Sequence, residues 1–307
     1  MILCCGEALI DMLPRQTTDG EPAFAPYAGG AVFNTAVALG RLGAETSFFS
    51  GLSSDLFGEI LTERLAQSKV ASDLAQRSDR PTTLAFVKLV DGHASYAFYD
   101  ENTAGRMLTP DDLPDLPASV TAAFFGGISL VVEPCAGAYE ALMLREAPSR
   151  VTMIDPNIRP GFIKDEAAFR GRIDRLIAAA DIVKLSDEDL HWLEGSGDLA
   201  GLAQAILARG PALVCVTAGA NGATGYTSER AVFVPSERAT VVDTVGAGDT
   251  FNAGVLAALD RQGLLHKTAL KSLTEAQIAA ALSLGVKAAA VTVSRAGANP
   301  PWAEELT

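Results

Sequence analysis

The chain has 307 residues, of which 49% are hydrophobic and 20% are charged, a composition typical of a globular protein with a large core and not of a disordered chain. Its formal net charge of −13 argues against a surface that binds nucleic acid. The same charge implies that an anionic substrate arrives with a metal ion or meets a locally positive pocket.

The cysteines and the apolar segments point to a cytoplasmic protein. Cys4 and Cys5 are neighbours in a strand-like segment and should point to opposite faces, and no cysteine pair has metal-ligand spacing. Glu7 and Asp11 interrupt the first apolar stretch and no basic segment precedes it, so we expect no signal peptide. Residues 120–132 form the most apolar run, which is too short and too polar to span a membrane.

Apolar spacing predicts strands and helices in alternation along the chain. Residues 1–9 are typical of a strand, 34–41 of a helix, 46–52 of a strand and 58–68 of a helix. The alternation continues with strand 122–125, helix 136–145, strand 151–155, helix 167–179, strand 182–185, helix 199–208, strand 212–217, and helices 251–262 and 275–291. Such repeated units predict an α/β fold, in which helices cover both faces of a mainly parallel sheet.

Three segments do not fit this alternation. They are residues 11–27, the strand-like pair within 82–99 that turns at Asp91 and Gly92, and a hairpin-like pair at 222–227 and 230–234. We interpret them as a small β-sheet that projects from the core as a lid, with lid strands from about 12–28 and 82–106. No linker divides the chain, so we expect one domain over residues 1–307.

The segment from Thr240 to Phe251 carries the strongest functional signal. The β-branched residues 240–242 are typical of the end of a buried strand, and a turn at Gly246, Ala247 and Gly248 then leads into a helix. Exposed N–H groups at a helix start attract anions, and Asp249 lies in that first turn. A carboxylate beside an anion site suits phosphoryl transfer to an alcohol. The alternative is a tight turn whose acid favours the positive helix end.

The stretch Asp243-Thr-x-Gly-Ala-Gly-Asp249 resembles the second signature of the ribokinase-like sugar kinase family. The resemblance implies a three-layer αβα sandwich with a small β-sheet lid. It also implies that Asp249 is the catalytic base and that Gly246, Ala247 and Gly248 form an anion hole. Several weaker motifs follow in the family's order over almost the whole chain.

Two motifs concern the sugar. Gly29 and Gly30 come before a predicted helix that contains Asn34, and this spacing resembles the family's first signature. Ala31, directly after Gly30, matches the fructokinase-like branch and not the ribokinases. Asp11 follows the first strand, where α/β sheets bind ligands. The resemblance implies that Asp11 and Asn34 bind sugar hydroxyls. The alternatives are a glycine hinge with Asn34 as helix cap and a solvated strand end.

The motif Asp155-Pro-Asn157-Ile-Arg159 follows another predicted strand. Asp-Pro-Asn and Arg-Pro-Gly are also ordinary turn sequences. By resemblance, Asn157 and Arg159 face the phosphates or the sugar, and arginine can bind a phosphate through two hydrogen bonds.

The resemblance further implies the sites for ATP and for cations. Lys184 and Ser186 precede a helix and would bind the nucleotide, with Asp189 linked to Mg²⁺ through water, although acids there are also ordinary capping residues. Further residues assigned by resemblance are Thr217, Gly219 and Gly222 at ATP, Asn299 on the adenine side, and Asp243 with the Val245 carbonyl at a monovalent cation, for which K⁺ is the candidate.

The predicted function is an ATP-dependent sugar kinase with Mg²⁺, with fructose as the first candidate acceptor. The chain has no P-loop, and Gly246 and Gly248 lack the third glycine of a dinucleotide-binding motif. Alternatives are a 2-keto-3-deoxygluconate kinase, with Arg106 available for the carboxylate, another ribokinase-like sugar or nucleoside kinase, and a catalytically silent binding protein. We expect a homodimer, because the predicted lid carries apolar residues that a second copy could cover. These residues are Phe24, Tyr27, Phe86 and Phe98.

Overall fold

The main sheet of the molecule is mostly parallel. The computed structural model describes residues 1–90 and 93–306. The strand order of the main sheet is β15-β14-β13-β12-β11-β10-β1-β4-β6. Its strands pair in parallel from β13 to β6, whereas β14 pairs in antiparallel fashion with both β13 and β15. These strands are β1 (Ile2–Cys5), β4 (Thr46–Phe49), β6 (Val70–Ala71), β10 (Ala122–Gly126), β11 (Val151–Asp155), β12 (Ile182–Ser186), β13 (Leu213–Thr217), β14 (Ala223–Tyr226) and β15 (Ala231–Val234).

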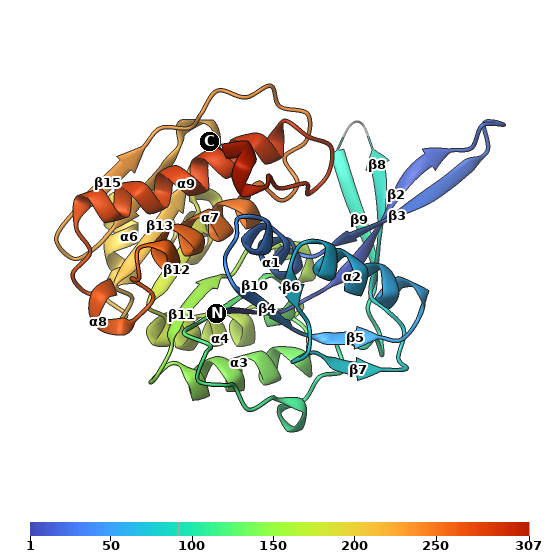
Figure 1. The fold of residues 1–307 in the computed structure, drawn as a ribbon, viewed down its shortest axis with the longest axis horizontal. Helices are drawn as coiled ribbons and strands as arrows, with labels where there is room; N and C mark the ends of the chain where they lie inside the picture. The colour runs from blue at the N-terminus through green and yellow to red at the C-terminus, as the bar shows by residue number, and fades with distance from the viewer. Residues whose placement is uncertain (91–92, 307) are drawn as a thin grey trace.

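Helices cover both faces of this sheet, as the α/β prediction requires (Figure 1). One face carries α1 (Ala31–Arg41), α2 (Leu56–Gln67), α7 (Ala247–Arg261), α8 (Lys267–Leu270) and α9 (Glu275–Val293). The other carries α3 (Cys135–Glu146), α4 (Glu166–Ala179), α5 (Asp187–Glu194) and α6 (Leu199–Leu207). Cys4 packs in the first core and Cys5 in the second, which confirms that their side chains point to opposite faces.

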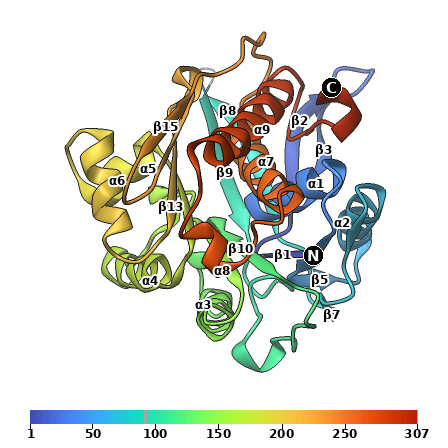
Figure 2. The same ribbon diagram turned by 60° about the vertical axis from the view of Figure 1, so that its left-hand side comes forward.

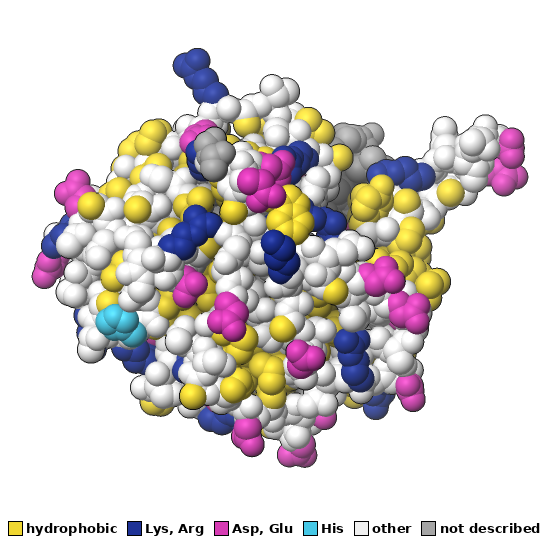
Figure 3. All heavy atoms as spheres, in the orientation of Figure 1, with side chains coloured by type: hydrophobic (Ala, Val, Ile, Leu, Met, Phe, Trp, Pro, Cys, Tyr) yellow, Lys and Arg dark blue, Asp and Glu magenta, His cyan; other side chains and the backbone are white. Residues whose placement is uncertain are grey.

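A second sheet stands at one end of the main sheet, with the strand order β3-β2-β8-β9. Its strands are β2 (Leu9–Gln16), β3 (Pro22–Gly29), β8 (Leu84–Val90) and β9 (His93–Tyr99). Figure 3 shows the far end of β2 and β3 standing clear of the body. Asp11 pairs with Ala85, and Ala85 pairs with Phe98, so these three residues share one face of the second sheet.

Several sequence predictions differ from the structure. The strand expected at 1–9 is two strands in different sheets, because the chain leaves the main sheet at Gly6. Residues 240–242 are not a buried strand: Val241 and Val242 are more than 60% exposed, and the chain there is irregular. The hairpin of β14 and β15 extends the edge of the main sheet and does not join the second sheet.

Some element boundaries also differ. The strand expected at 46–52 ends at Phe49, and β5 (Gly51–Ser53) then pairs with β7 (Gln76–Ser78) in a small separate sheet. The helix α5, which the periodicity did not reveal, follows β12 directly. The turn predicted at Asp91 and Gly92 lies outside the described residues, although β8 and β9 pair in antiparallel fashion as a hairpin requires.

Helices α7 and α9 lie side by side against the sheet, as both ribbon views show (Figures 1 and 2). Their backbones come close at Gly254 and Gly285: a Cβ atom on Gly254 would lie 2.5 Å from the Gly285 Cα. By length and composition α9 is also apolar enough to cross a membrane, but a core helix of a soluble fold passes the same test. Its contacts with α7, β14 and β15 account for its apolar character.

This close approach predicts that Gly254→Ala destabilises the protein by about 1–3 kcal/mol, because the added methyl group meets backbone atoms that have little freedom to move. Urea denaturation measures the change. Gly171→Ala in α4 is the control, since its methyl group would only meet the flexible Arg175 side chain at 3.5 Å. There the higher helix propensity of alanine should stabilise the protein by about 0.5–1 kcal/mol. Equal effects of both changes would contradict the packing argument.

Candidate active site

The site forms where the first turn of α7 meets the first turn of α1. Asp249 is only 7% exposed, and its Oδ2 accepts a hydrogen bond of 2.9 Å from the Asn34 amide. Thr35 donates to the Asp249 carbonyl oxygen at 3.2 Å. The structure therefore brings together two of the residues that the sequence analysis selected, although they stand far apart in the chain. Asn34 is not the helix cap, since α1 begins at Ala31 with Gly30 as its cap.

The surroundings of Asp249 raise the pKa of its carboxyl group to about 7. Burial is the main cause, and the nearby charges of Asp155 and Glu7 act in the same direction. The hydrogen bond from Asn34 and the charge of Lys184 lower the pKa and oppose this shift. A carboxylate with such a pKa is well matched to accept a proton near neutral pH.

The backbone next to Asp249 turns sharply at Gly246, which has a φ of 78°. The N–H of Ala247 donates to the Thr244 carbonyl oxygen at 3.3 Å. In the part of the chain that the structure describes, the N–H groups of Gly246 and Gly248 have no hydrogen-bond partner. Such N–H groups at a helix start can bind an anion.

A buried ion pair lies behind this turn. Lys184 in the middle of β12 bonds to Asp155 Oδ2 at 2.9 Å, and both residues are at most 5% exposed. Burial acts to lower the pKa of Lys184, but the charge and hydrogen bond of Asp155 outweigh it and the pKa is raised. A Cβ atom on Gly248 would lie 3.1 Å from the Lys184 Nζ. The ammonium group is therefore next to the turn and can attract phosphate oxygens.

Asn252, one turn after Asp249 in α7, completes this network. Its amide nitrogen donates to Asp155 Oδ2 at 2.7 Å. Its Oδ1 is a buried acceptor with no hydrogen-bond partner among the described residues. A buried acceptor of this kind is costly unless a ligand or water donates to it.

The sugar-side residues lie on the second sheet and at its junction with α1. Asp11 is on β2, and burial raises the pKa of its carboxyl group to about 6. Gly29 at the end of β3 packs directly against this carboxylate, so a side chain there would collide with it. Gly30 follows as the cap of α1 with a φ of 108°. The two glycines thus set Asp11 close to the helix that carries Asn34.

Asn157 and Arg159 lie in the loop after β11. Asn157 adopts a φ of 46° and donates its N–H to Asp155 Oδ1 at 3.1 Å. The Arg159 side chain is exposed and hydrogen-bonds only the neighbouring Ile158 carbonyl oxygen, within the described chain. Its guanidinium is therefore available to a ligand.

Asp189 and Ser186 both have structural contacts. Ser186 caps α5 by accepting the Asp189 N–H at 3.0 Å, which is the capping arrangement weighed as the alternative. Asp189 Oδ1 accepts the Ile158 N–H at 3.2 Å, so it also holds the loop that carries Arg159. Burial, followed by the charge of Asp155, raises the pKa of Asp189.

The remaining predicted nucleotide and cation residues lie in loops at the edge of the site. Thr217 ends β13, and Gly219 and Gly222 bound the short 3-10 helix η4 (Gly219–Asn221). Asp243 accepts the N–H of Val245 at 3.0 Å and that of Gly297 at 2.9 Å, so its carboxylate ties two loops together.

Asn299 takes part in a contact that the sequence did not suggest. Arg41 at the end of α1 donates to its Oδ1 at 2.9 Å and to the Pro300 carbonyl oxygen at 2.7 Å. The Arg41 guanidinium also lies 5.3 Å from the centre of the Trp302 ring. The loop on the predicted adenine side is therefore fastened to α1.

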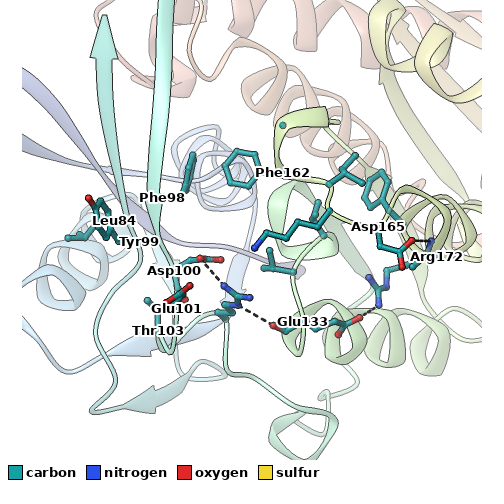
Figure 4. Close-up of a pocket in the computed structure, with 18 of the residues that line it drawn as sticks. Leu84, Phe98, Tyr99, Asp100, Glu101, Thr103, Glu133, Phe162, Asp165 and Arg172 are labelled. Atoms are coloured by element: carbon teal, nitrogen blue, oxygen red, sulfur yellow. Dashed lines mark hydrogen bonds and ion pairs between the residues drawn. The ribbon is translucent and has the colours of Figure 1, made fainter.

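A cavity of about 830 Å³ adjoins the site between the second sheet and α4. Figure 4 shows Phe98 and Phe162 next to each other in its lining, where the two rings pack edge to face with their centres 4.2 Å apart. Arg106, which also lines it, forms an ion pair with Asp100 at 2.9 Å and donates to the Glu133 carbonyl oxygen. Neither Asp11 nor Asp249 is among the described residues that line this cavity.

Comparisons with known proteins place the chain in a family. The model of the pfkB family of carbohydrate kinases matches residues 1–305. The chain belongs to the pfkB family. It is 61% identical over 275 residues to a fructokinase of Rhizobium leguminosarum bv. trifolii, covering 90% of this chain and 84% of that one.

Solved structures of fructokinases have the same fold. A fructokinase from Xylella fastidiosa with bound ATP matches with a TM-score of 0.90 and 31% identity, over 99% of this chain and 96% of that one. A double mutant of a Vibrio cholerae fructokinase, with fructose, ADP and potassium ion bound, matches with a TM-score of 0.84 and 25% identity, over 97% and 93% of the chains. The predicted ribokinase-like α/β fold and sugar kinase class are confirmed.

The sequence analysis missed some residues of the site. Asp155 had no predicted role, although an acid at the end of a buried strand stands where α/β sheets bind ligands. Asn252 is a polar residue one helical turn after Asp249, within an otherwise apolar stretch. Glu7 stands in the motif that ends at Asp11, but the sequence gives no indication of its role.

The pKa of Asp249 predicts a pH dependence. The free enzyme should lose kcat/KM for the sugar below about pH 7, because protonation removes the base. Asn34→Ala should move this acid limb to higher pH, since the hydrogen bond from Asn34 lowers the Asp249 pKa. Rates measured from pH 5 to 9 check both points. An acid limb that stays in place in a folded Asn34→Ala protein would contradict the assigned role of this hydrogen bond.

Proposed function

We propose that the chain is an ATP-dependent fructokinase, which converts D-fructose and ATP to fructose 6-phosphate and ADP. The observation that carries the proposal is a buried carboxylate, Asp249, with a raised pKa at the N-terminal end of a helix. Identity of 61% to a fructokinase supports fructose as the acceptor.

In the proposed reaction, Asp249 accepts the proton of the sugar's primary hydroxyl group. The oxygen of that group then forms a bond to the γ-phosphorus of ATP, and the bond from this phosphorus to the bridging oxygen breaks, which releases ADP. The N–H groups of Gly246 and Gly248, together with the Lys184 ammonium, stabilise the charge on the transferred phosphoryl group. Asp11 and Asn34 orient the sugar.

The oxygen-rich donor set suits Mg²⁺, which prefers carboxylate, amide and water oxygens. Asp189 and the unpartnered Asn252 Oδ1 would hold its water shell. When bound, Mg²⁺ neutralises charge on the ATP phosphates. Asp243 and the Val245 carbonyl group remain candidates for K⁺, and Arg159, Thr217, Gly219, Gly222 and Asn299 for contacts with ATP or the sugar.

The alternative acceptor, 2-keto-3-deoxygluconate, carries a carboxylate that needs a free cation. Arg106, the proposed partner, already bonds to Asp100. In the adjoining cavity four acids accompany three cations, Arg106, Lys164 and Arg172. This charge balance favours a neutral sugar.

A first experiment measures ADP release with fructose, other ketoses, aldoses, nucleosides and 2-keto-3-deoxygluconate, with and without Mg²⁺ and K⁺. We expect fructose to give the highest kcat/KM. Asp249→Asn should lower kcat about 10²- to 10⁴-fold because it removes the base, whereas Asp260→Asn on the same helix should not. Higher kcat/KM with the keto acid would replace fructose as the substrate, and no release with any sugar would indicate a silent binding protein.

We also expect one cytoplasmic kinase domain that forms a homodimer through the second sheet, which acts as its lid. Phe24 is 48% exposed and Tyr99 62%, and both rings contact Phe86 edge to face. Such an aromatic row suits burial against a second copy. Light scattering should give the mass of a dimer, and Phe24→Glu should give a monomer. Leu56→Glu, at another exposed apolar residue, is the control, and a dimeric Phe24→Glu protein would contradict this interface.

A further inference from the structure

Glu7 lies in the connection between β1 and β2 and joins three segments of the molecule. Its Oε1 accepts the N–H of Ala31 at 2.8 Å, at the start of α1. Its Oε2 accepts the N–H of Ser129 at 3.2 Å, in the 3-10 helix η2 (Gly127–Leu130). Each carboxylate oxygen thus has a backbone donor from a different element.

The surrounding backbone is shaped to fit this side chain. Gly127, with a φ of 67°, packs so closely against the Glu7 carboxylate that any side chain there would collide with it. A Cβ atom on Gly30 would lie 2.8 Å from the Glu7 carbonyl oxygen and 3.1 Å from its Cγ. The glycines on both sides leave room for Glu7 and for little else.

Helix α1 needs this contact because its own sequence supplies no cap. Its capping residue is Gly30, no side chain from that position bonds to the first turn, and the first turn contains no acid. The Glu7 carboxylate takes over this role from another part of the chain. It satisfies one of the free N–H groups and places a negative charge at the positive end of the helix.

The position of α1 in turn determines the position of the proposed catalytic groups. Asn34 and Thr35, in the first turns of α1, bond to the side chain and to the backbone of Asp249. Gly29, just before the helix, contacts the Asp11 carboxylate. A shift of this helix end would therefore move both the base and the sugar-side turn, and a displacement of about 1 Å can cost about 10² in rate.

We propose that Glu7 is a positioning residue, which fixes the start of α1 and thereby sets Asn34 against Asp249 and Gly29 against Asp11. The proposal rests on the kinase function proposed above. Glu7 touches no substrate in this scheme. It acts through the backbone of Ala31 and Ser129.

The charge of Glu7 gives the proposal a second, electrostatic readout. Asp249 is influenced by Glu7 and Asp155, which raise its pKa after the larger effect of burial, and by Lys184, which lowers it. The Glu7 charge also adds to the effect of burial in raising the pKa of the Cys135 thiol and of the Tyr139 hydroxyl group. Removing the Glu7 charge lowers the Asp249 pKa, whereas loosening the Asn34 hydrogen bond raises it, so a variant without the charge should have its acid limb of kcat/KM at lower pH than a variant that only shortens the side chain.

The test compares two variants at Glu7 with an exposed control. Glu7→Gln removes the charge and leaves one N–H facing an amide NH₂ group. We expect kcat/KM for fructose to fall about 10- to 100-fold, with KM for ATP unchanged and the acid limb at lower pH than in Glu7→Asp. Glu7→Asp keeps the charge on a shorter side chain, so it should weaken fructose use and move the acid limb to higher pH, because the hydrogen bond from Asn34 to Asp249 loosens while the charge stays. Glu63→Gln removes one exposed acid from α2 and should change nothing.

Hydrogen exchange of the amides at residues 31–35 gives a readout that does not need activity. We expect faster exchange in both Glu7 variants than in the parent and in Glu63→Gln. Unchanged exchange in both Glu7 variants, or an unchanged kcat/KM for fructose in folded Glu7→Gln, overturns the proposal. If Glu7→Gln does not fold, Glu7→Asp decides the matter by the same measurements. If the parent protein phosphorylates no sugar, the proposed function fails, and exchange alone then tests the role of Glu7.

Discussion

The hydrogen bond from the Asn34 amide to the Asp249 carboxylate is the interaction on which the site depends. It joins two helices from distant parts of the chain, α1 and α7, which pack on the same face of the sheet. A carboxylate that is only 7% exposed needs hydrogen-bond donors to remain ionised. Asn34 supplies one, and without it the surrounding apolar core would favour the protonated acid. In the proposed reaction, helix packing and proton transfer are thus coupled in one contact.

A shortage of positive charge is the second constraint. Asp155, Asp189 and Asp249 lie close to a single buried cation, Lys184. The proximity of these acids explains why burial is reinforced by like charges in raising the pKa of Asp249 and Asp189. The chain has a net charge of −13, so a nucleotide needs a local source of positive charge. In the proposed site, the metal ion and Lys184 supply that charge at the turn.

The sequence predicted the alternating core and the residues of the α7 turn because both leave local signals, in apolar periodicity and in glycine spacing. It was wrong at residues 240–242, where β-branched residues lie in an exposed loop. A local strand pattern does not tell whether a sheet has an edge free to pair with that segment. The sequence also missed the roles of Glu7 and Asp155. Their partners are backbone or side-chain groups that only the tertiary fold brings near, so no local pattern records them.

The contact between Arg41 and the loop at Asn299 and Pro300 joins two segments that lie 258 and 259 residues apart in the chain. During synthesis, α1 leaves the ribosome long before these acceptors exist. Until then the Arg41 guanidinium lacks the carbonyl and amide oxygens that satisfy it in the finished protein. The contact of Arg41 is therefore completed only after residue 300 has been synthesised, so a nascent chain that stops short of this loop lacks the closure even when its sheet has formed.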